Sequence, residues 1–362
     1  MDLIGTAASG GWPDVLAAAP GLARRRLRTT LRRTGWGGGP RSGWVGRIAP
    51  TVVAAAEPEA GHWLTESITL TDTAVVVAVV RSRTGRHRRV VKMPCTTEGA
   101  ESLGRQAGVL AALRADPRLA GWAKITPRPL ASGAFDGHRY WVEDVVPGTP
   151  VTGTALRTFR EGPVFAAAVR LIEDLHARTA AASTVDPADI SLWVDQPLSR
   201  LADFCSAHPR HREDLPALGR LGAQLSEELL GKRVRTSLIH GDYWAGNLLT
   251  SGPAVTGVVD WDRASAHQLP LLDLLHLTLF TERARSGREL GEIVVRLLQD
   301  NAAADAIGVP AGQLNAWLGG VPPATAVLLF WLRHISLFIE SEGHGDNRDW
   351  LRRNVHTVLA RC

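Results

Sequence analysis

The sequence predicts an α+β protein of two lobes, a small one built on an antiparallel sheet and a larger, mainly helical one. Short apolar runs separated by turn residues follow one another between residues 61 and 91, which is typical of antiparallel strands. Most of the later chain shows apolar residues at helical spacing. The division we predict is a basic extension with a glycine-rich linker, a small lobe and a large lobe, at residues 1–60, 61–146 and 147–362.

Composition sets broad limits on the protein. The 362 residues are 45% hydrophobic, which is sufficient for a sizeable core, and carry a formal net charge of +5. The three cysteines lie far apart and are expected to be reduced thiols. The N-terminus resembles no secretory leader, and no run of 18 apolar residues occurs. We therefore expect a soluble, cytoplasmic protein that does not span a membrane.

The basic excess is local. Residues Val15–Ala56 contain eight arginines and no acid. Pro13–Arg33 has apolar residues at helical spacing, with arginines over the rest of its surface, and Gly35–Gly46 reads as a glycine-rich linker. One interpretation is a solvated helix docked on the body. The other is an arm that binds an acidic peptide, an acidic protein or a membrane surface. No nucleic-acid-binding fold accompanies the arginines, so no nucleic acid is expected.

The small lobe begins with three predicted antiparallel strands. Apolar runs within residues 62–70, 75–80 and 90–91 are separated by turns at 71–73 and 83–86, and the third run ends at Lys92. A helix over Glu101–Arg114 follows, and then a proline-stiffened connector at Ile125–Leu130. An apolar strand within Tyr140–Gly148 breaks at Pro-Gly, where we expect the lobes to join.

The large lobe is expected to be mainly helical. A helix is predicted over Gly162–Arg178, and residues 186–235 read as mostly helical without indicating a ligand. Helices are predicted after the central stretch at Asp273–Thr281, Glu289–Ala304, a short segment after Val309, Ala324–Glu340 and Asn347–Arg361.

The central stretch Leu238–Asp262 carries the chemistry. Two short apolar runs flank turn residues, which predicts a hairpin that brings Asn247 and Asp260 to one end, beside a loop carrying Asp242. Two carboxylates and an amide oxygen suit a hard divalent cation and a separate base. An aspartate, an asparagine five residues later and a further aspartate is the arrangement that protein kinases use for phosphoryl transfer.

The string HGDYWAGN, with the first aspartate of VVDWD thirteen residues after Asn247, resembles the catalytic segment of the aminoglycoside phosphotransferase and choline kinase-like branch of the protein kinase-like fold. The resemblance implies transfer from ATP (or GTP), with Mg²⁺, to a hydroxyl. It assigns Asp242 as the base and Asn247 and Asp260 as Mg²⁺ ligands. It also assigns His240 as a brace of the loop. Asp262 is a less favoured alternative to Asp260.

The resemblance extends to two further positions. It implies that Asp273 opens the next helix and hydrogen-bonds the catalytic loop from below. The motif has Gly241 where protein kinases commonly have an arginine that binds a phosphorylated activation loop, and only twelve residues separate Asp260 from Asp273. We therefore predict an enzyme that activation-loop phosphorylation does not switch.

The same resemblance implies that Lys92 holds the α- and β-phosphates. The acid that should pair with this lysine aligns with Gln106, which can accept a hydrogen bond but cannot neutralise an ammonium group. Glu101 or Glu98 could replace it if the helix is rotated.

The nucleotide-covering and hinge segments complete the implied nucleotide site. The loop near Ser67–Thr73 has no glycine, so hydroxyls such as those of Ser67 and Thr71 are expected to cover the phosphates. The backbone of Glu143 and Val145 is expected to read the adenine edge, with the side chains mattering less.

The acceptor stays open at this stage. An antibiotic, an amino sugar or a metabolite alcohol is the leading class, and a Ser/Thr hydroxyl of a peptide in a natural-product pathway, with help from a partner protein, is the alternative. A non-catalytic, pseudokinase-type scaffold is the third possibility. Acidic residues near a C-terminal turn could bind a cationic acceptor or be merely solvated: Glu340, Glu342, Asp346 and Asp349.

Overall fold

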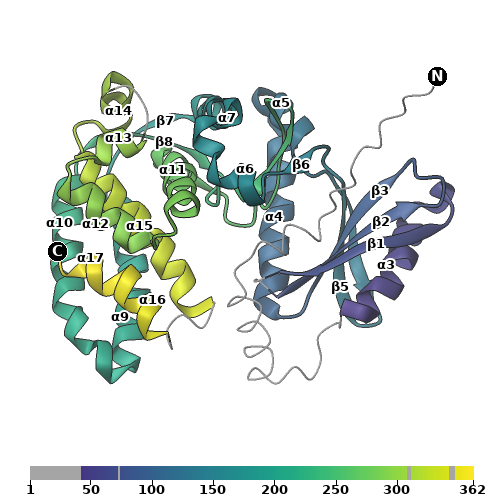
Figure 1. The fold of residues 1–362 in the computed structure, drawn as a ribbon, viewed down its shortest axis with the longest axis horizontal. Helices are drawn as coiled ribbons and strands as arrows, with labels where there is room; N and C mark the ends of the chain where they lie inside the picture. The colour runs from purple at the N-terminus through teal and green to yellow at the C-terminus, as the bar shows by residue number, and fades with distance from the viewer. Residues whose placement is uncertain (1–41, 72–73, 308–310, 342–346) are drawn as a thin grey trace.

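The computed structural model of the chain describes residues 42–71, 74–307, 311–341 and 347–362 (Figure 1). The predicted arginine-rich helix at Pro13–Arg33 lies outside the described residues, as do Glu342 and Asp346 of the predicted acidic turn. Asp349 of that turn forms an exposed ion pair with Arg352, at 2.6 Å. Figure 1 shows a lobe built on a sheet beside a larger helical lobe, as the sequence predicts.

The small lobe contains a five-stranded antiparallel sheet of order β1-β2-β3-β5-β4. Three of its strands were predicted as a set, and β4 and β5 extend the sheet beyond β3. The strands are β1 (Trp63–Leu70), β2 (Val75–Ser82), β3 (Arg88–Pro94), β4 (Pro129–Phe135) and β5 (His138–Asp144).

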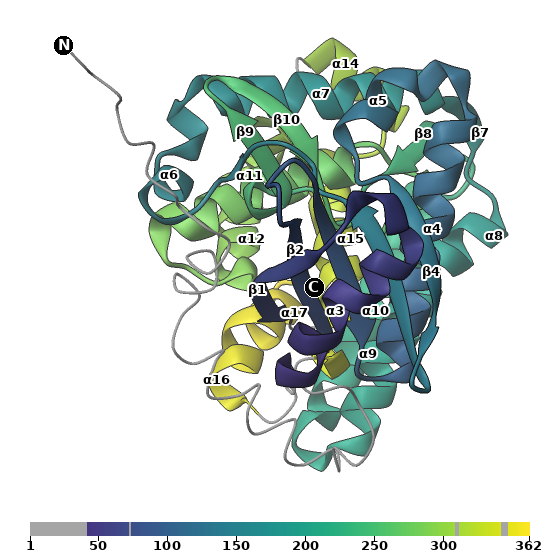
Figure 2. The ribbon, with the colours of Figure 1, turned by 90° about the vertical axis from the view of Figure 1, so that its right-hand side faces the viewer.

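A helix that the sequence did not predict covers one face of this sheet. Residues 42–46 of the predicted linker belong to helix α3 (Ser42–Ala56), which lies against the sheet in Figures 1 and 2. Its buried side chains are at helical spacing and join the core formed by one face of β2 and β3: Val45, Ala49, Val52 and Val53. Burial of this apolar face stabilises a helix whose glycine and proline content reads locally as linker. The predicted boundary at residue 60 therefore follows a helix that packs in the small lobe.

The opposite face of the sheet carries helix α4 (Thr97–Ala115), which begins earlier than predicted because the Thr96 side chain caps Gly99 N, at 3.1 Å. Leu103 of α4 packs against Val75 and Trp141 of the sheet. Helix α5 (Ala120–Ile125) then leads to β4. The sheet thus lies between α3 on its outer face and α4 on the face that also bears Lys92.

The large lobe is mainly helical, with two small three-stranded sheets of order β10-β9-β6 and β11-β8-β7. Its strands are β6 (Thr149–Pro150), β7 (Ala181–Thr184), β8 (Arg233–Ile239), β9 (Leu248–Ser251), β10 (Ala254–Val258) and β11 (Ser265–Gln268). Its α-helices are α6 (Gly153–Arg157), α7 (Pro163–Thr179), α8 (Pro187–Ile190), α9 (Gln196–Ala207), α10 (Leu215–Leu229), α11 (Leu271–Ser286), α12 (Leu290–Gln299), α13 (Ala303–Ile307), α14 (Ala311–Leu318), α15 (Pro323–Ser341), α16 (Arg348–Leu351) and α17 (Thr357–Leu359).

Two predicted helices are interrupted in the structure. The prediction over Glu289–Ala304 is wrong at its end, since α12 stops at Gln299 and Asn301 adopts a φ of 50°, which breaks the helix before α13. The C-terminal prediction over Asn347–Arg361 becomes α16, a π-helical segment η8 (Arg352–His356) and α17.

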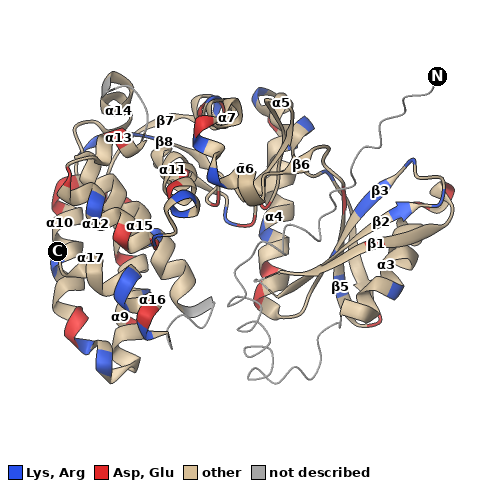
Figure 3. Ribbon diagram, in the orientation of Figure 1, with Lys and Arg blue, Asp and Glu red and all other residues tan. Residues whose placement is uncertain are grey.

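The surface carries charges of both signs, and the length and apolar content of the long helices bear on whether they could cross a membrane. Lysines and arginines are interspersed with acidic residues over both lobes (Figure 3). Within the described residues, no single helix is long and apolar enough to cross a membrane, although the bent pair Gly312–Leu318 and Pro323–Ile339 reaches that length and composition together.

Candidate active site

The hairpin β9–β10 brings together the two ends of the central motif. Val258 pairs with Leu248, and Val259 N donates a 3.0 Å hydrogen bond to Asn247 O. Asn247, at the end of a short 3-10 turn (Ala245–Asn247), therefore lies at the same end of the hairpin as Asp260. Asp260 has a φ of 70°, a conformation that asparagine and aspartate tolerate better than most residues and that often marks a functional position.

Asp273 holds the loop that precedes this hairpin from below. Its two carboxylate oxygens accept the backbone N–H groups of His240 and Gly241, each at 2.8 Å, as the sequence predicts. His176, at the buried end of α7, also reaches Asp273, with Nε2 and Oδ2 3.0 Å apart. The loop therefore rests on a buried polar group rather than on water.

The ring of His240 fixes the loop from a second side. Nδ1 accepts from Asp242 N at 3.2 Å, so Nε2 carries the proton that it shares with Val259 O at 3.0 Å. Burial lowers the pKa of His240, which keeps this ring neutral and its tautomer fixed. The predicted bracing contact of His240 is present.

Gly241 is a position where only glycine fits. Its φ is 78°, and a Cβ built there would lie 2.2 Å from Arg263 O. The segment from Asp260 to Asp273 is short and ordered around β11, which pairs with β8. The close approach of Arg263 thus explains the glycine, independently of any role in phosphorylation.

Asp242 lies where it can accept a proton. Asn247 Nδ2 donates to Asp242 Oδ2 and to Asp242 O, each at 2.9 Å. His276 Nε2 approaches Oδ1 to 3.3 Å without hydrogen-bond geometry. Burial and the neighbouring Asp260 raise the pKa of Asp242 to about 7, so this carboxyl titrates near neutrality.

The two aspartates of the DWD string have different surroundings. Ser102 of α4 donates to Asp262 Oδ2 at 2.6 Å, so Asp262 links the lobes. Desolvation and the like charge of Asp262 both raise the pKa of Asp260. Since the residue is exposed to solvent, the charge of Asp262 is the larger of these two causes. An open carboxylate whose charge is incompletely balanced suits a bound cation.

Lys92 pairs with Glu143 on the strand that leads to the hinge. Lys92 Nζ lies 3.0 Å from Glu143 Oε2, and Gln106 Nε2 of α4 donates to Glu143 Oε1 at 2.5 Å. Gln106 and Glu143 are both buried. The Glu143 side chain, which we expected to matter less than its backbone, thus supplies a carboxylate beside Lys92 where Gln106 has none.

The predicted phosphate-covering residues differ in position. Ser67 pairs with Val79 and Lys92 pairs with Val77, so both side chains lie on the face of the sheet that bears α4. Thr71 follows β1, and its hydroxyl accepts from Val75 N at 3.1 Å, which shapes the turn. Val145 follows β5 directly, in the segment that joins the lobes.

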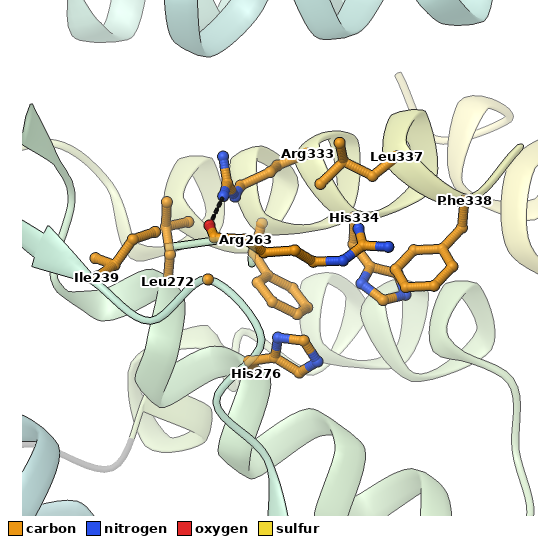
Figure 4. A pocket seen from close by; sticks show the side chains of 10 residues that line it. Ile239, Arg263, Leu272, His276, Arg333, His334, Leu337 and Phe338 are labelled. Carbon is orange, nitrogen blue, oxygen red and sulfur yellow. Dashed lines mark hydrogen bonds between the residues drawn. The ribbon is translucent and has the colours of Figure 1, made fainter. Parts of the chain in front are cut away.

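A small pocket opens beside the catalytic loop on the side of α15 (Figure 4). Arg263 lies over the ring of Phe338, with Cζ 4.3 Å from the ring centroid, and its carbonyl accepts from Arg333 at 3.3 Å. The described residues that line this pocket are aromatic, aliphatic, histidine, glycine or arginine, with no acid among them: Ile239, Gly241, Arg263, Leu272, His276, Phe330, Arg333, His334, Leu337 and Phe338.

Sequence reasoning missed four residues near the site: Ser102, His276, Arg263 and the side chain of Glu143. One signal was available for Glu143, because it lies two residues after Trp141 in an extended strand and must therefore share the face of that tryptophan. The other three come from α4, α11 and the segment before β11, and their contacts depend on tertiary packing.

These elements define a class of protein. A sheet lobe with a buried Lys–Glu pair faces a helical lobe with an Asp–Asn–Asp loop, which is the arrangement of kinase-like phosphotransferases. The model of the phosphotransferase enzyme family (APH) matches residues 75–307. The chain belongs to this family and is a phosphotransferase of the kinase type, with a hydroxyl group as acceptor.

Solved structures share the fold at low sequence identity. A thermostable mutant of aminoglycoside phosphotransferase APH(4)-Ia, in a complex with AMP-PNP and hygromycin B, aligns with a TM-score of 0.55 and 13% identity over 86% of this chain and 98% of that chain. The GDP complex of wild-type aminoglycoside 2′-phosphotransferase-IIIa aligns with a TM-score of 0.50 and 16% identity over 87% and 99%. Macrolide 2′-phosphotransferase MphH from Brachybacterium faecium gives 0.47 and 16% over 84% and 98%. No curated protein matches significantly.

Proposed function

We propose that this chain transfers the γ-phosphoryl group of ATP or GTP, with Mg²⁺, to a hydroxyl of a small molecule. The observation that carries the proposal is the contact of Asn247 with Asp242, which leaves the amide oxygen of Asn247 to face a cation while its nitrogen orients the base. Two solved relatives of the same fold are complexes with AMP-PNP and with GDP, which supports a nucleotide donor.

The donor set fits magnesium. Asn247 and Asp260 offer oxygen ligands at one end of a hairpin, and Asp260 is open to solvent. Such oxygens, with phosphate oxygens and water, are the ligands Mg²⁺ prefers. The bound ion would neutralise charge on the phosphates. On the opposite lobe, Lys92 would hold the α- and β-phosphates while Glu143 fixes its ammonium group in place.

Asp242 would accept the proton of the acceptor hydroxyl. As the new bond from the acceptor oxygen to the γ-phosphorus forms, the bond from that phosphorus to the bridging oxygen of the nucleotide breaks, and the hydroxyl proton passes to Asp242 Oδ1 or Oδ2. The pKa of about 7 makes this carboxylate a stronger base than an ordinary aspartate while leaving about half of it ionised at neutral pH.

The positive charges beside the loop favour an acceptor without a strong positive charge. Arg263 and Arg333 line the small pocket there, whose volume of about 10 Å³ is room for roughly one water molecule and not for the acceptor itself. Arg263 acts electrostatically on Asp242, so a polycationic amino sugar bound over Asp242 would be repelled by it, whereas a neutral or anionic alcohol would not. A peptide hydroxyl is the alternative acceptor. A scaffold without catalysis is supported less well, because Lys92, Asp242, Asn247 and Asp260 are all present.

The test is a transfer screen with labelled ATP over cationic antibiotics, neutral macrolide-type and metabolite alcohols, and serine- or threonine-containing peptides. Calorimetric titration with ATP and Mg²⁺ accompanies it, with Asp260→Ala as the variant. We expect Mg²⁺-dependent nucleotide binding that Asp260→Ala weakens, and transfer to uncharged or anionic alcohols. Absence of Mg²⁺-dependent binding in the wild type sinks the enzymatic proposal, and transfer confined to polycationic acceptors sinks the acceptor proposal alone.

A further inference from the structure

Three ligand-type side chains converge in the large lobe, away from the site described above. His211 and Asp214 come from a 3-10 segment η5 (Pro209–Asp214) between α9 and α10, and His356 ends η8 near the C-terminus. One ring nitrogen of each histidine and one carboxylate oxygen of Asp214 lie within 4.8 Å of one another. Figure 1 shows α9, α10 and α17 on the side of the helical lobe far from the sheet lobe.

One polar atom of each residue in this cluster is buried without a hydrogen bond among the described residues. His211 is 7% exposed, and the three atoms are its Nδ1, the Oδ2 of Asp214 and the Nε2 of His356. His356 Nε2 and Asp214 Oδ2 are 3.1 Å apart, but the contact lacks the direction of a hydrogen bond. Leaving several buried polar atoms unsatisfied is costly, so three in one place require an explanation.

A positive ion explains all three atoms together. Lone pairs of two imidazole nitrogens and one carboxylate oxygen are the donors that Zn²⁺ and similar divalent transition ions prefer. Tetrahedral ligands of zinc lie about 3.4 Å apart, so a cluster within 4.8 Å closes onto an ion by small side-chain rotations.

We propose that His211, Asp214 and His356 form a divalent transition-metal site of the zinc type, with water in a fourth position. The ion would join η5, in the region between α9 and α10, to the C-terminal segment η8. Because His211 and His356 are 145 residues apart in the sequence, the ion would act as a clip between distant parts of the large lobe. This inference does not depend on the proposed catalytic function.

Metal binding tests the proposal directly. Full-length protein without a histidine tag is stripped with EDTA and titrated with Zn²⁺ against a chromogenic chelator. We expect one equivalent to bind, and we expect His211→Asn and His356→Asn each to weaken binding by at least about tenfold. His87→Ala is the matched control, because His87 is exposed on the small lobe, and it should bind as the wild type does.

Two further measurements keep the result independent of how the variants fold. Co²⁺ in place of Zn²⁺ should give the visible bands of a tetrahedral nitrogen and oxygen site, and Zn²⁺ should raise the melting temperature of the wild type but not of His211→Asn. The proposal is overturned if the wild type binds no equivalent of metal, or if both histidine variants bind as tightly as the wild type. A thiolate-to-cobalt charge-transfer band would also overturn it, because it would locate the metal on a cysteine.

Discussion

Glu143 Oε2 lies 3.0 Å from Lys92 Nζ, so the lysine that we propose binds phosphate has its carboxylate partner on strand β5 rather than on helix α4. Gln106 occupies the α4 position and donates to the other oxygen of Glu143. The acid thus lies on β5 and the amide on α4, whereas the sequence resemblance implies an acid on α4. Lys92 therefore keeps a buried counter-charge, although Gln106 carries none.

This arrangement predicts that the two residues can be swapped. Glu143→Gln removes the counter-charge of Lys92 and should lower kcat/KM for the nucleotide by about 10- to 100-fold, equivalent to about 1.4–2.8 kcal/mol. Gln106→Glu alone brings two carboxylates together and should destabilise the fold. The double variant restores one acid and one amide and should recover part of both losses. Steady-state kinetics and thermal unfolding of the three variants measure this; a double variant no better than the worse single would contradict it.

Asp242→Asn should separate binding from turnover. The amide keeps the size of the side chain but cannot accept a proton, so kcat should fall by about 10²- to 10⁴-fold while nucleotide affinity changes little. Calorimetry and labelled-phosphate transfer measure the two quantities. Asp305→Asn, at an exposed position of α13, is the matched control and should leave both unchanged. An equal loss of affinity and turnover in Asp242→Asn would show that Asp242 is not the base.

The central site was predictable because its geometry is local. Asp242, Asn247 and Asp260 lie within one loop and hairpin, and hairpin pairing alone fixes which end they share. The contact of Asp273 with the loop followed from the family resemblance and is present in the structure. Lys92 likewise follows from the end of an apolar run on β3.

The remaining features depend on packing between distant segments. The Glu143 side chain meets Lys92 because β3 and β5 are neighbours in a sheet whose order does not follow the sequence. Helix α3 forms because Val45, Ala49, Val52 and Val53 find an apolar sheet face, and local composition cannot reveal that face. His276 reaches Asp242 from α11, across 34 residues of sequence that no motif connects.

The raised pKa of Asp242 predicts opposite pH trends for activity and stability. In the folded, nucleotide-free protein the carboxyl titrates near pH 7, against about 3.9 when unfolded, so the folded state binds the extra proton between these values. The stabilising contribution is complete below about pH 4 and is lost as the pH rises through about 7. The transfer rate should instead rise over the same range, because the base must be ionised.

Urea unfolding of the wild type and of Asp242→Asn isolates this contribution. Asparagine does not titrate, so the stability of the variant relative to the wild type should increase from about pH 5 to about pH 8. Both measurements use protein freed of metal and nucleotide, since a bound cation would lower the pKa of the nearby carboxylates. A stability difference that does not change with pH would rule out a raised pKa for Asp242.

Gly241→Ala should damage the catalytic loop more than a positive φ alone can explain. A Cβ at this position would lie 2.2 Å from Arg263 O, a backbone atom that cannot rotate away, so the loop or the segment before β11 must shift. Gly252→Ala is the matched control, because Gly252 has a φ of 57° in the turn of the same catalytic hairpin and open space around it. The control should lose only about 1–2 kcal/mol from the left-handed conformation.

Gly241→Ala should lose more stability than the control and at least about tenfold in transfer rate, because displacement of the loop moves Asp242 relative to the acceptor. Equal effects of the two substitutions on unfolding and transfer would mean that the contact with Arg263 does not fix the loop.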